Sequence, residues 1–186
     1  MSDPRRQRLD SYTLPVSYSA GAAWLTQLVW FCLASPLVAL RCLPGSLWRC
    51  CVLRSFGAQI GVGCRIKPGL RVKYPWRLQV GCHCWLGEDV WIDNLAPIRL
   101  GDQVCLSQGV YLCTGNHNYA TSDFSLICKP IQIDSGAWIG AQACLAPGVT
   151  IGSDAVVSLG SVVIQSVEPA TVVAGNPAQL LRSRWR

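Results

Sequence analysis

The stretch that decides the fold is residues 133–163, which read IDSGAWIGAQACLAPGVTIGSDAVVSLGSVV. Within it, Ile, Leu or Val recurs at every sixth position, at 133, 139, 145, 151, 157 and 163. A period of six fits neither the roughly 3.6-residue turn of an α-helix nor a heptad. It is typical of short strands joined by corners, with the aliphatic residue pointing to the axis of a triangular coil. The stretch therefore predicts an all-β chain folded as a parallel β-helix.

The repeat extends toward the N-terminus and is interrupted at defined places. The same residue types occupy 60, 66, 72, then 80, 86, 92, then 100, 106 and 112. Successive turns start 20, 20, 33 and 18 residues apart, so one turn carries fifteen residues beyond its three hexads. The excess follows Leu112, and a loop of this length in a compact repeat is usually functional. We expect the β-helix over residues 56–168, with an active-site loop at about 113–130.

Two segments, residues 1–55 and 169–186, flank the repeat. Residues 1–77 hold 11 Lys and Arg but 2 acids, and residues 20–40 carry no formal charge. A helix of this length could cross a bilayer, but Ser35-Pro36 predicts a kink or an end within it. We rank a peripheral helical segment on an anionic membrane first, a helix packed on its own domain second and a membrane span third. Residues 169–186 are expected to form a short C-terminal helix or tail.

Composition restricts the class of protein, its compartment and its partners. Hydrophobic types make up 51% of the chain and charged types 14%, which excludes a disordered chain. The eleven cysteines show no disulfide framework and indicate reduced thiols in a cytoplasmic protein. If the N-terminal segment binds lipid, we expect the protein at the cytoplasmic face of the inner membrane. Because no recognised binding module accompanies the basic residues, we expect no nucleic-acid partner.

Several motifs resemble one family. The sequence VAGNPA at 173–178 and the Gly residues that follow the aliphatic anchors resemble the hexapeptide-repeat acyltransferases. WIDN at 91–94 and TGNHNY at 114–119 are similar, more narrowly, to the colanic-acid-biosynthesis type of acetyltransferase. The resemblance implies a left-handed coil, a homotrimer and acetyl-CoA bound in a groove between neighbouring chains. It also implies acetyl transfer to a hydroxyl of a sugar or lipid-linked sugar in exopolysaccharide or cell-envelope polysaccharide synthesis.

The chain has two histidines, His83 and His117. His117 lies in the long loop and matches the family's catalytic base, since imidazole has the near-neutral pKa that proton abstraction from a hydroxyl needs. The alternative is an exposed loop histidine. His83 lies between two cysteines, but alternate side chains on a strand point to opposite faces, so we expect no metal site. Two histidines are also too few for the three-histidine metal centre of β-helical carbonic anhydrases.

A histidine base needs a group that orients it. Asp123 is the nearest carboxylate, and a backbone carbonyl or a water molecule are the alternatives. The resemblance places Asp93, Asn94 and Tyr119 at the acceptor, where an amide can bond the sugar or a developing oxyanion. The alternative for Asp93 and Asn94 is a corner of the coil, since both types tolerate turn geometry.

The resemblance also assigns the groove for acetyl-CoA. It implies a lining by Trp138, Gly140 and Ala141, and a turn at Leu159 and Gly160 whose backbone N–H holds the thioester arm. Relatives carry Lys where this chain has Gln165, so we expect Arg182 to contact the CoA phosphates. Two other functions stay open: a non-catalytic hexapeptide-repeat scaffold, and an acetyltransferase for a small xenobiotic acceptor. The presence of His117 in its loop favours an enzyme over a scaffold.

Overall fold

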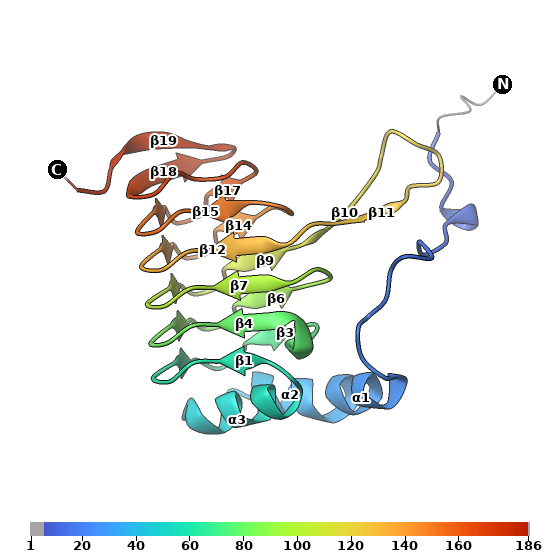
Figure 1. Ribbon diagram of the computed structural model, residues 1–186, viewed down its shortest axis with the longest axis horizontal. Helices are drawn as coiled ribbons and strands as arrows, with labels where there is room; N and C mark the ends of the chain where they lie inside the picture. Colours follow the sequence, from blue (N-terminus) through green and yellow to red (C-terminus); the bar gives the residue numbers. More distant parts are fainter. Residues whose placement is uncertain (1–5, 186) are drawn as a thin grey trace.

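The computed structural model describes residues 6–185. Figure 1 shows a stack of β-coils that rests on a layer of helices, with a long hairpin projecting from one side. Three sheets of parallel strands form the three faces of a prism. This architecture confirms the β-helix that the six-residue period predicts.

Each turn contributes one strand to each face. The first face holds β1 (Gln59–Ile60), β4 (Leu78–Val80), β7 (Ile98–Leu100), β12 (Ile131–Ile133) and β15 (Thr150–Ile151). The second face holds β2 (Arg65–Ile66), β5 (Trp85–Leu86), β8 (Cys105–Leu106), β13 (Trp138–Ile139) and β16 (Val156–Val157). The third face holds β3 (Arg71–Val72), β6 (Trp91–Asp93), β9 (Tyr111–Cys113), β14 (Cys144–Leu145) and β17 (Val162–Val163). We call the bend between the second and third faces the second corner, and the bend from the third face into the next turn the third corner.

Hydrophobic burial along the axis holds the coils together. All fifteen aliphatic anchors of the repeat are at most 9% exposed. The register places each anchor over the anchor of the previous turn, as where Ile139 pairs with Leu106 and with Val157. Burial of one such side chain stabilises a fold by about 1.5–3 kcal/mol. The hexad anchors therefore supply the core of the prism.

A helical layer covers the N-terminal end of this core. It consists of α1 (Trp24–Val29), the π-helical segment η2 (Trp30–Ala34), α2 (Ser35–Ala39) and α3 (Leu47–Ser55). The Trp30 indole is fully buried and donates a hydrogen bond to the Val72 carbonyl of the first coil. The layer is thus packed on its own domain, and the helix continues past Ser35-Pro36 as short pieces. No helix within residues 6–185 is long and apolar enough to cross a membrane.

The insertions into the repeat gather at the third corner. The short ones are η3 (Pro75–Arg77) and the turn at residues 94–97. The long one forms an antiparallel hairpin of β10 (Gly115–His117) and β11 (Leu126–Cys128). The N-terminal segment with η1 (Leu9–Ser11) runs beside this hairpin (Figure 1), and the Arg8 N–H donates to the Ser122 carbonyl. The hairpin therefore stands against a second stretch of chain.

The C-terminal segment differs from the expected helix or tail. β18 (Thr171–Gly175) pairs in parallel with β16 and extends the second face. β19 (Ala178–Ser183) then folds back antiparallel on β18. Gly175 has a φ of 107°, a conformation open to glycine, which lets the chain reverse at this point. The chain therefore ends in a β-hairpin, and the expectation of a short helix is wrong.

Candidate active site

His117 stands at the outer end of β10, on the hairpin that projects from the prism. Its Nδ1 lies 2.7 Å from the carbonyl oxygen of Phe124, and the two rings stack with centroids 4.3 Å apart and planes 3° apart. The Tyr12 ring meets the imidazole edge-on, with centroids 5.5 Å apart. The hairpin and the N-terminal segment together hold the imidazole in one orientation.

The carbonyl contact fixes the tautomer of His117. A carbonyl oxygen only accepts hydrogen bonds, so Nδ1 carries a proton, and in the neutral imidazole Nε2 then keeps its lone pair. Of the three orienting groups that the sequence leaves open, the structure has the backbone carbonyl. This arrangement suits a neutral imidazole that accepts a proton at Nε2.

Asp123 does not orient His117 in this structure. Its side chain is fully exposed at the turn of the hairpin, and hydrogen bonding from Thr121, with a smaller contribution from Ser125, lowers its pKa. The carboxylate therefore stays ionised and braces the turn. Sequence reasoning missed Phe124 and Tyr12. An apolar aromatic between Asp123 and Ser125 was a signal for Phe124, whereas no local pattern connects Tyr12 to a hairpin a hundred residues away.

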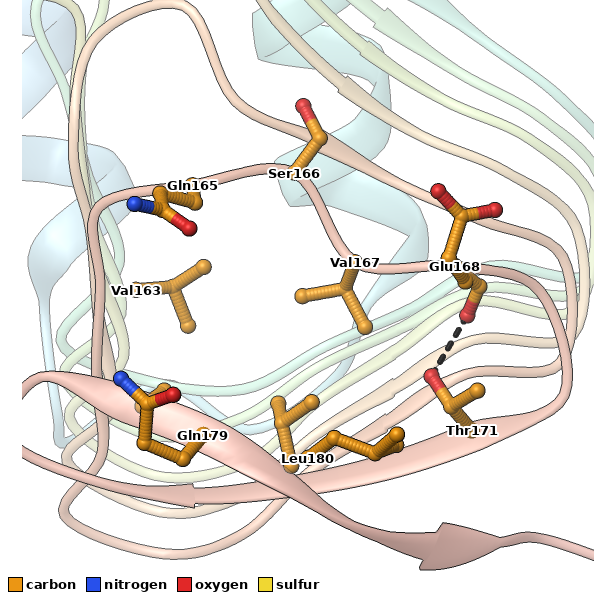
Figure 2. A pocket seen from close by; sticks show the side chains of 10 residues that line it. Val163, Gln165, Ser166, Val167, Glu168, Thr171, Gln179 and Leu180 are labelled. Atoms are coloured by element: carbon orange, nitrogen blue, oxygen red, sulfur yellow. Dashed lines mark hydrogen bonds between the residues drawn. The ribbon is translucent and has the colours of Figure 1, made fainter.

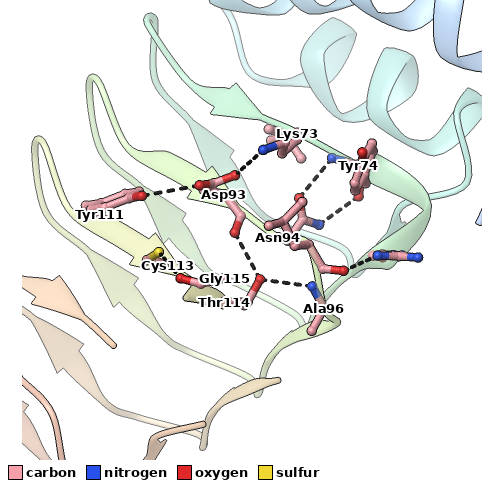
Figure 3. Close-up of polar contacts among 12 residues, drawn as sticks. Lys73, Tyr74, Asp93, Asn94, Ala96, Tyr111, Cys113, Thr114 and Gly115 are labelled. Carbon is pink, nitrogen blue, oxygen red and sulfur yellow. Dashed lines mark hydrogen bonds and ion pairs between the residues drawn. The ribbon is translucent and has the colours of Figure 1, made fainter. Parts of the chain in front are cut away.

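A polar cluster occupies the third corner at the base of the hairpin (Figure 3). Asp93 is its centre: Oδ1 forms a 3.0 Å ion pair with Lys73 Nζ, and Oδ2 accepts a 3.2 Å hydrogen bond from the Tyr111 hydroxyl. The Thr114 hydroxyl donates to the Asp93 carbonyl at 3.0 Å and accepts from the Ala96 N–H at 2.9 Å. These contacts tie three successive turns together beneath the hairpin.

The three residues predicted at the acceptor differ in their surroundings. Asn94 is fully buried, its Oδ1 accepts from the Tyr74 N–H at 2.9 Å, and its Nδ2 donates to the Tyr74 carbonyl at 2.7 Å. Its amide is therefore committed to shaping the corner, and the expectation that Asn94 contacts the acceptor does not fit this geometry. Asp93 is partly exposed, at 15% of its side chain. Tyr119, in the hairpin's loop, is 81% exposed and available to a ligand.

Five of the six residues predicted to hold acetyl-CoA line one groove on the second face and second corner. This donor groove has a volume of 470 Å³ and is lined by Trp138, Gly140, Ala141, Leu159 and Arg182, together with Ser107, Gln108 and Ser158. Its floor is small or apolar, and a guanidinium lies among the lining residues. Such a lining fits an extended thioester arm whose other end carries phosphates.

Two glycines at the second corner, Gly140 and Gly160, have different structural roles. A Cβ on Gly140 would lie 2.5 Å from the Leu159 nitrogen, so glycine is needed where the two turns stack. Gly160 has a φ of 67°, and its N–H donates to the Ala141 carbonyl at 2.8 Å. That N–H is therefore bonded within the chain and is not free for the thioester, contrary to the expectation from the sequence. Gly160 is not among the residues that line the donor groove.

Gln165 lies away from the donor groove. It lines a pocket of 240 Å³ at the C-terminal end of the coil, where Val163 and Val167 form an apolar floor (Figure 2). The charged side chain in this pocket is Glu168, whose carbonyl accepts a 2.6 Å hydrogen bond from the Thr171 hydroxyl. A carboxylate and an apolar floor do not suit CoA phosphates, which leaves Arg182 as the cation of the donor groove.

The cysteines and His83 were the other candidates for disulfide bonds or a metal site. All eleven cysteines are free thiols. Across the described part of the chain, no three His, Cys, Asp or Glu side chains lie close enough to hold a metal ion. His83 has a φ of 58° at a corner of the coil, between the half-exposed Cys82 and the buried Cys84.

The predicted base and the donor groove lie on different corners of one chain. His117 projects from the third corner, whereas Gly140 and Leu159 belong to the second corner, and the strands of the third face lie between them. One copy of the chain therefore does not bring the two parts of the predicted site together.

Comparison with known proteins gives consistent results. The hexapeptide repeat of succinyl-transferase matches residues 130–165. The Escherichia coli protein named as the colanic acid biosynthesis acetyltransferase WcaF is 38% identical over 183 residues, which cover 96% of this chain and 97% of that protein. This similarity confirms the resemblance drawn from the motifs.

Solved structures extend the comparison to the fold. A hexapeptide-repeat acetyltransferase from Vibrio cholerae, solved with acetyl-CoA, matches with a TM-score of 0.77 and 28% identity over 89% of this chain and 92% of that one. A maltose O-acetyltransferase from Clostridium difficile matches with a TM-score of 0.78 and 25% identity over 91% of this chain and 92% of that one. The chain therefore belongs to the hexapeptide-repeat acetyltransferases, enzymes that use acetyl-CoA as the acetyl donor.

Proposed function

We propose that this acetyltransferase moves acetyl to a hydroxyl of a sugar used in exopolysaccharide or cell-envelope polysaccharide synthesis. The name of the Escherichia coli relative refers to colanic acid synthesis, and the Clostridium difficile neighbour is named for acetylation of maltose. The observation that carries the proposal is the contact of His117 Nδ1 with the Phe124 carbonyl, since it leaves a basic Nε2 for an alcohol proton.

The chemistry of the step assigns a task to each group. Acetyl-CoA supplies an activated acetyl group on sulfur. His117 Nε2 takes the proton of the acceptor hydroxyl as its oxygen bonds to the acetyl carbon, and the same proton can leave with the departing thiol. Tyr119 and Asp93 are proposed to contact the acceptor, since the first is exposed and the second lies at the base of the hairpin. Trp138, Ala141 and the other lining residues of the donor groove would hold the thioester arm.

The proposed assembly is a homotrimer. Because His117 and the donor groove occupy different corners of one chain, a neighbouring copy is needed to place a hairpin over a groove. A ring of copies joined head to tail repeats this contact at every interface. The assembly would therefore form three composite sites.

We also propose that the helical layer rests on an anionic membrane at the cytoplasmic face. Nine large apolar side chains of residues 24–47 are each at least 38% exposed, among them Leu25, Leu33 and Leu47. The adjoining first turn carries Arg65, Lys67 and other cations, and each basic residue near an anionic surface adds about 1 kcal/mol of binding. An exposed apolar surface beside cations is typical of a peripheral membrane contact.

The function is tested by following thiol release from acetyl-CoA with a panel of free and lipid-linked sugars. Mass spectrometry of the product should show one added acetyl ester that alkaline hydroxylamine removes. Turnover with a small xenobiotic alcohol but with no sugar would contradict the sugar acceptor.

The membrane contact has its own test. The variant Leu25→Ser, Leu33→Ser, Leu47→Ser should bind phosphatidylserine vesicles less than the wild type in co-sedimentation, with acetyl transfer to a free sugar unchanged. A matched triple variant on the first face, Gln79→Ser, Arg99→Ser, Thr150→Ser, controls for surface changes in general. Equal sedimentation of all three proteins would refute membrane docking by this layer.

A further inference from the structure

The donor groove continues into a second groove toward the helical layer. This basic groove has a volume of 370 Å³, and it shares Ser107, Gln108 and Trp138 with the donor groove. Beyond these shared residues it is lined by Trp85, two turns nearer the helical layer than Trp138, and by the cations Arg65 and Lys67, one turn further. The two grooves therefore lie next to each other on the second face and meet at Ser107, Gln108 and Trp138.

The cations of the basic groove are free to pair with a ligand. Among the described residues, no carboxylate lies within 4.0 Å of a basic nitrogen of Arg65 or Lys67. Glu88 also lines the groove, so two cations face one acid and the groove carries a net positive charge. This charge favours a ligand with a carboxylate or a phosphate.

An aromatic ring supports one of the cations, Arg65. The Arg65 guanidinium lies over the Trp85 indole, 4.8 Å from its centroid, and stacking of this kind leaves the in-plane N–H donors directed outward. Trp85 is 51% exposed and Trp138 is 49% exposed, and a 2.9 Å hydrogen bond from Nε1 to the Ser107 hydroxyl fixes the Trp138 ring. Exposed, fixed indoles offer flat apolar surfaces that fit the C–H face of a pyranose ring.

The opposite side of the second corner repeats this pattern. On the third face, the Arg71 guanidinium lies 4.5 Å from the Trp91 centroid, and Trp91 stacks on Tyr111 with centroids 4.5 Å apart. Arg65 and Arg71 thus stand on both sides of one corner, each supported by an indole in the next turn. A saccharide longer than one residue would meet cations and rings on either side.

We propose that the basic groove binds the acceptor and that the acceptor is an anionic saccharide, whose ring contacts Trp85 and whose carboxylate or phosphate pairs with Arg65 and Lys67. This inference rests on the proposed function. If the donor groove holds the thioester arm with its phosphates toward Arg182, the acetyl end points toward Trp138, and the basic groove is the adjoining groove on the other side of this residue. An acceptor there would approach the acetyl carbon from the side opposite to CoA.

The experiment compares methyl glucoside, methyl glucuronide and glucose 1-phosphate with wild type, Arg65→Ala and Arg99→Ala. Arg99 is a matched control, because it is an exposed arginine on the first face that bonds to Gln79. Wild type and Arg99→Ala should use at least one charged sugar with a kcat/KM about tenfold or more above that of the neutral sugar. Arg65→Ala should lose that preference while the KM of acetyl-CoA stays within twofold.

Calorimetric binding of the same three sugars in the presence of CoA separates the two proposals. The preferred charged sugar should bind more tightly than methyl glucoside, and 0.5 M NaCl should remove the difference; the glucuronide and the phosphate arms identify which anion is favoured. Equal binding and equal use of neutral and charged sugars would overturn the anionic acceptor and leave sugar acetylation intact. A raised KM for acetyl-CoA in Arg65→Ala would assign the basic groove to the donor, and failure of all three sugars to bind or react would refute both proposals.

Discussion

His117 Nδ1 and the carbonyl oxygen of Phe124 lie 2.7 Å apart, between the end of β10 and the loop that precedes β11. A backbone carbonyl cannot take up a proton at neutral pH, so it orients the imidazole without becoming a second titrating group. The geometry differs from a side-chain dyad, in which the orienting carboxylate also stabilises the imidazolium. A base held in this way depends on the conformation of the hairpin.

Replacement of His117 should separate chemistry from binding. His117→Ala should lower kcat by a factor of about 10²–10⁴, because general base catalysis typically contributes that much. The affinity for CoA should hardly change, because His117 is not among the residues that line the donor groove and its loss leaves the packing of the coils intact. Stopped-flow or steady-state thiol release gives kcat, and calorimetry gives the affinity for CoA.

Asp123→Asn is the matched control for this variant. Since the Asp123 side chain is exposed and the Phe124 backbone orients the imidazole, its kcat should stay within about threefold of wild type. A loss as large as that of His117→Ala would show that the carboxylate orients the base after all. Near wild-type turnover of His117→Ala would place the chemistry elsewhere.

The sequence predicted the fold better than the details of the site. Each hexad forms one side of a coil and points its anchor to the axis, where the anchors of successive coils stack. The hexad pattern therefore directly determines which residues are buried. The position of the hairpin also followed from spacing, because extra residues must leave the stack. Contacts between a side chain and a distant backbone have no such signature. The sequence left a coil corner open for Asn94 and a backbone carbonyl open as the group that orients His117, but it named neither Tyr74 nor Phe124 as the partner.

The C-terminal hairpin shows a second limit of the sequence. After Val163 the six-residue period decays, and the residues of β19 show no alternation of apolar and polar types. The strand forms because β18 leaves an open edge and Gly175 lets the chain turn back. Pairing with β18 therefore determines the structure of β19, and the local sequence preference of β19 does not.

Two glycine variants test the stacking of the coils. Gly140→Ala should destabilise the fold by about 3 kcal/mol, because its Cβ would press on the backbone of the next turn at 2.5 Å. Gly160→Ala meets open space and carries only the backbone cost of a positive φ, about 1 kcal/mol. Urea unfolding followed by circular dichroism measures both values. Equal destabilisation of the two variants would contradict the close approach at Gly140.

The buried Cys84 thiol makes the free energy of unfolding depend on pH in the alkaline range. Burial raises the pKa of the Cys84 thiol from its ordinary value of 9.0 to about 12. Above pH 9 the unfolded chain releases this proton while the folded chain keeps it, so the unfolded state binds fewer protons and stability falls as pH rises toward 12. Urea midpoints at pH 8 and pH 10.5 measure the loss.

Cys84→Ala should reduce this alkaline loss, and alanine occupies the same place in the hexad at Ala137 and Ala155, where it is fully buried. Below pH 9, iodoacetamide should modify the exposed Cys32, Cys42 and Cys51 in the native protein and spare Cys84. Peptide mapping identifies the modified sites. Rapid native modification of Cys84, or an unchanged alkaline loss in Cys84→Ala, would show that this thiol is not held in the wall of the coil.

The composite site can be tested with two inactive variants. His117→Ala lacks the base, and Ala141→Trp fills the donor groove, so each protein alone should be inactive. If every site combines the hairpin of one copy with the groove of the next, some interfaces of a randomly mixed trimer regain a complete site. These are the interfaces at which an Ala141→Trp chain presents its intact His117 to the intact groove of a His117→Ala chain. In an equal mixture about a quarter of the interfaces meet this condition, so refolding the two variants together should restore up to about a quarter of wild-type kcat per chain. Mixing without unfolding serves as the control and should restore no activity while the trimers do not exchange chains. Absence of recovery after verified co-assembly would show that base and groove act within a single chain.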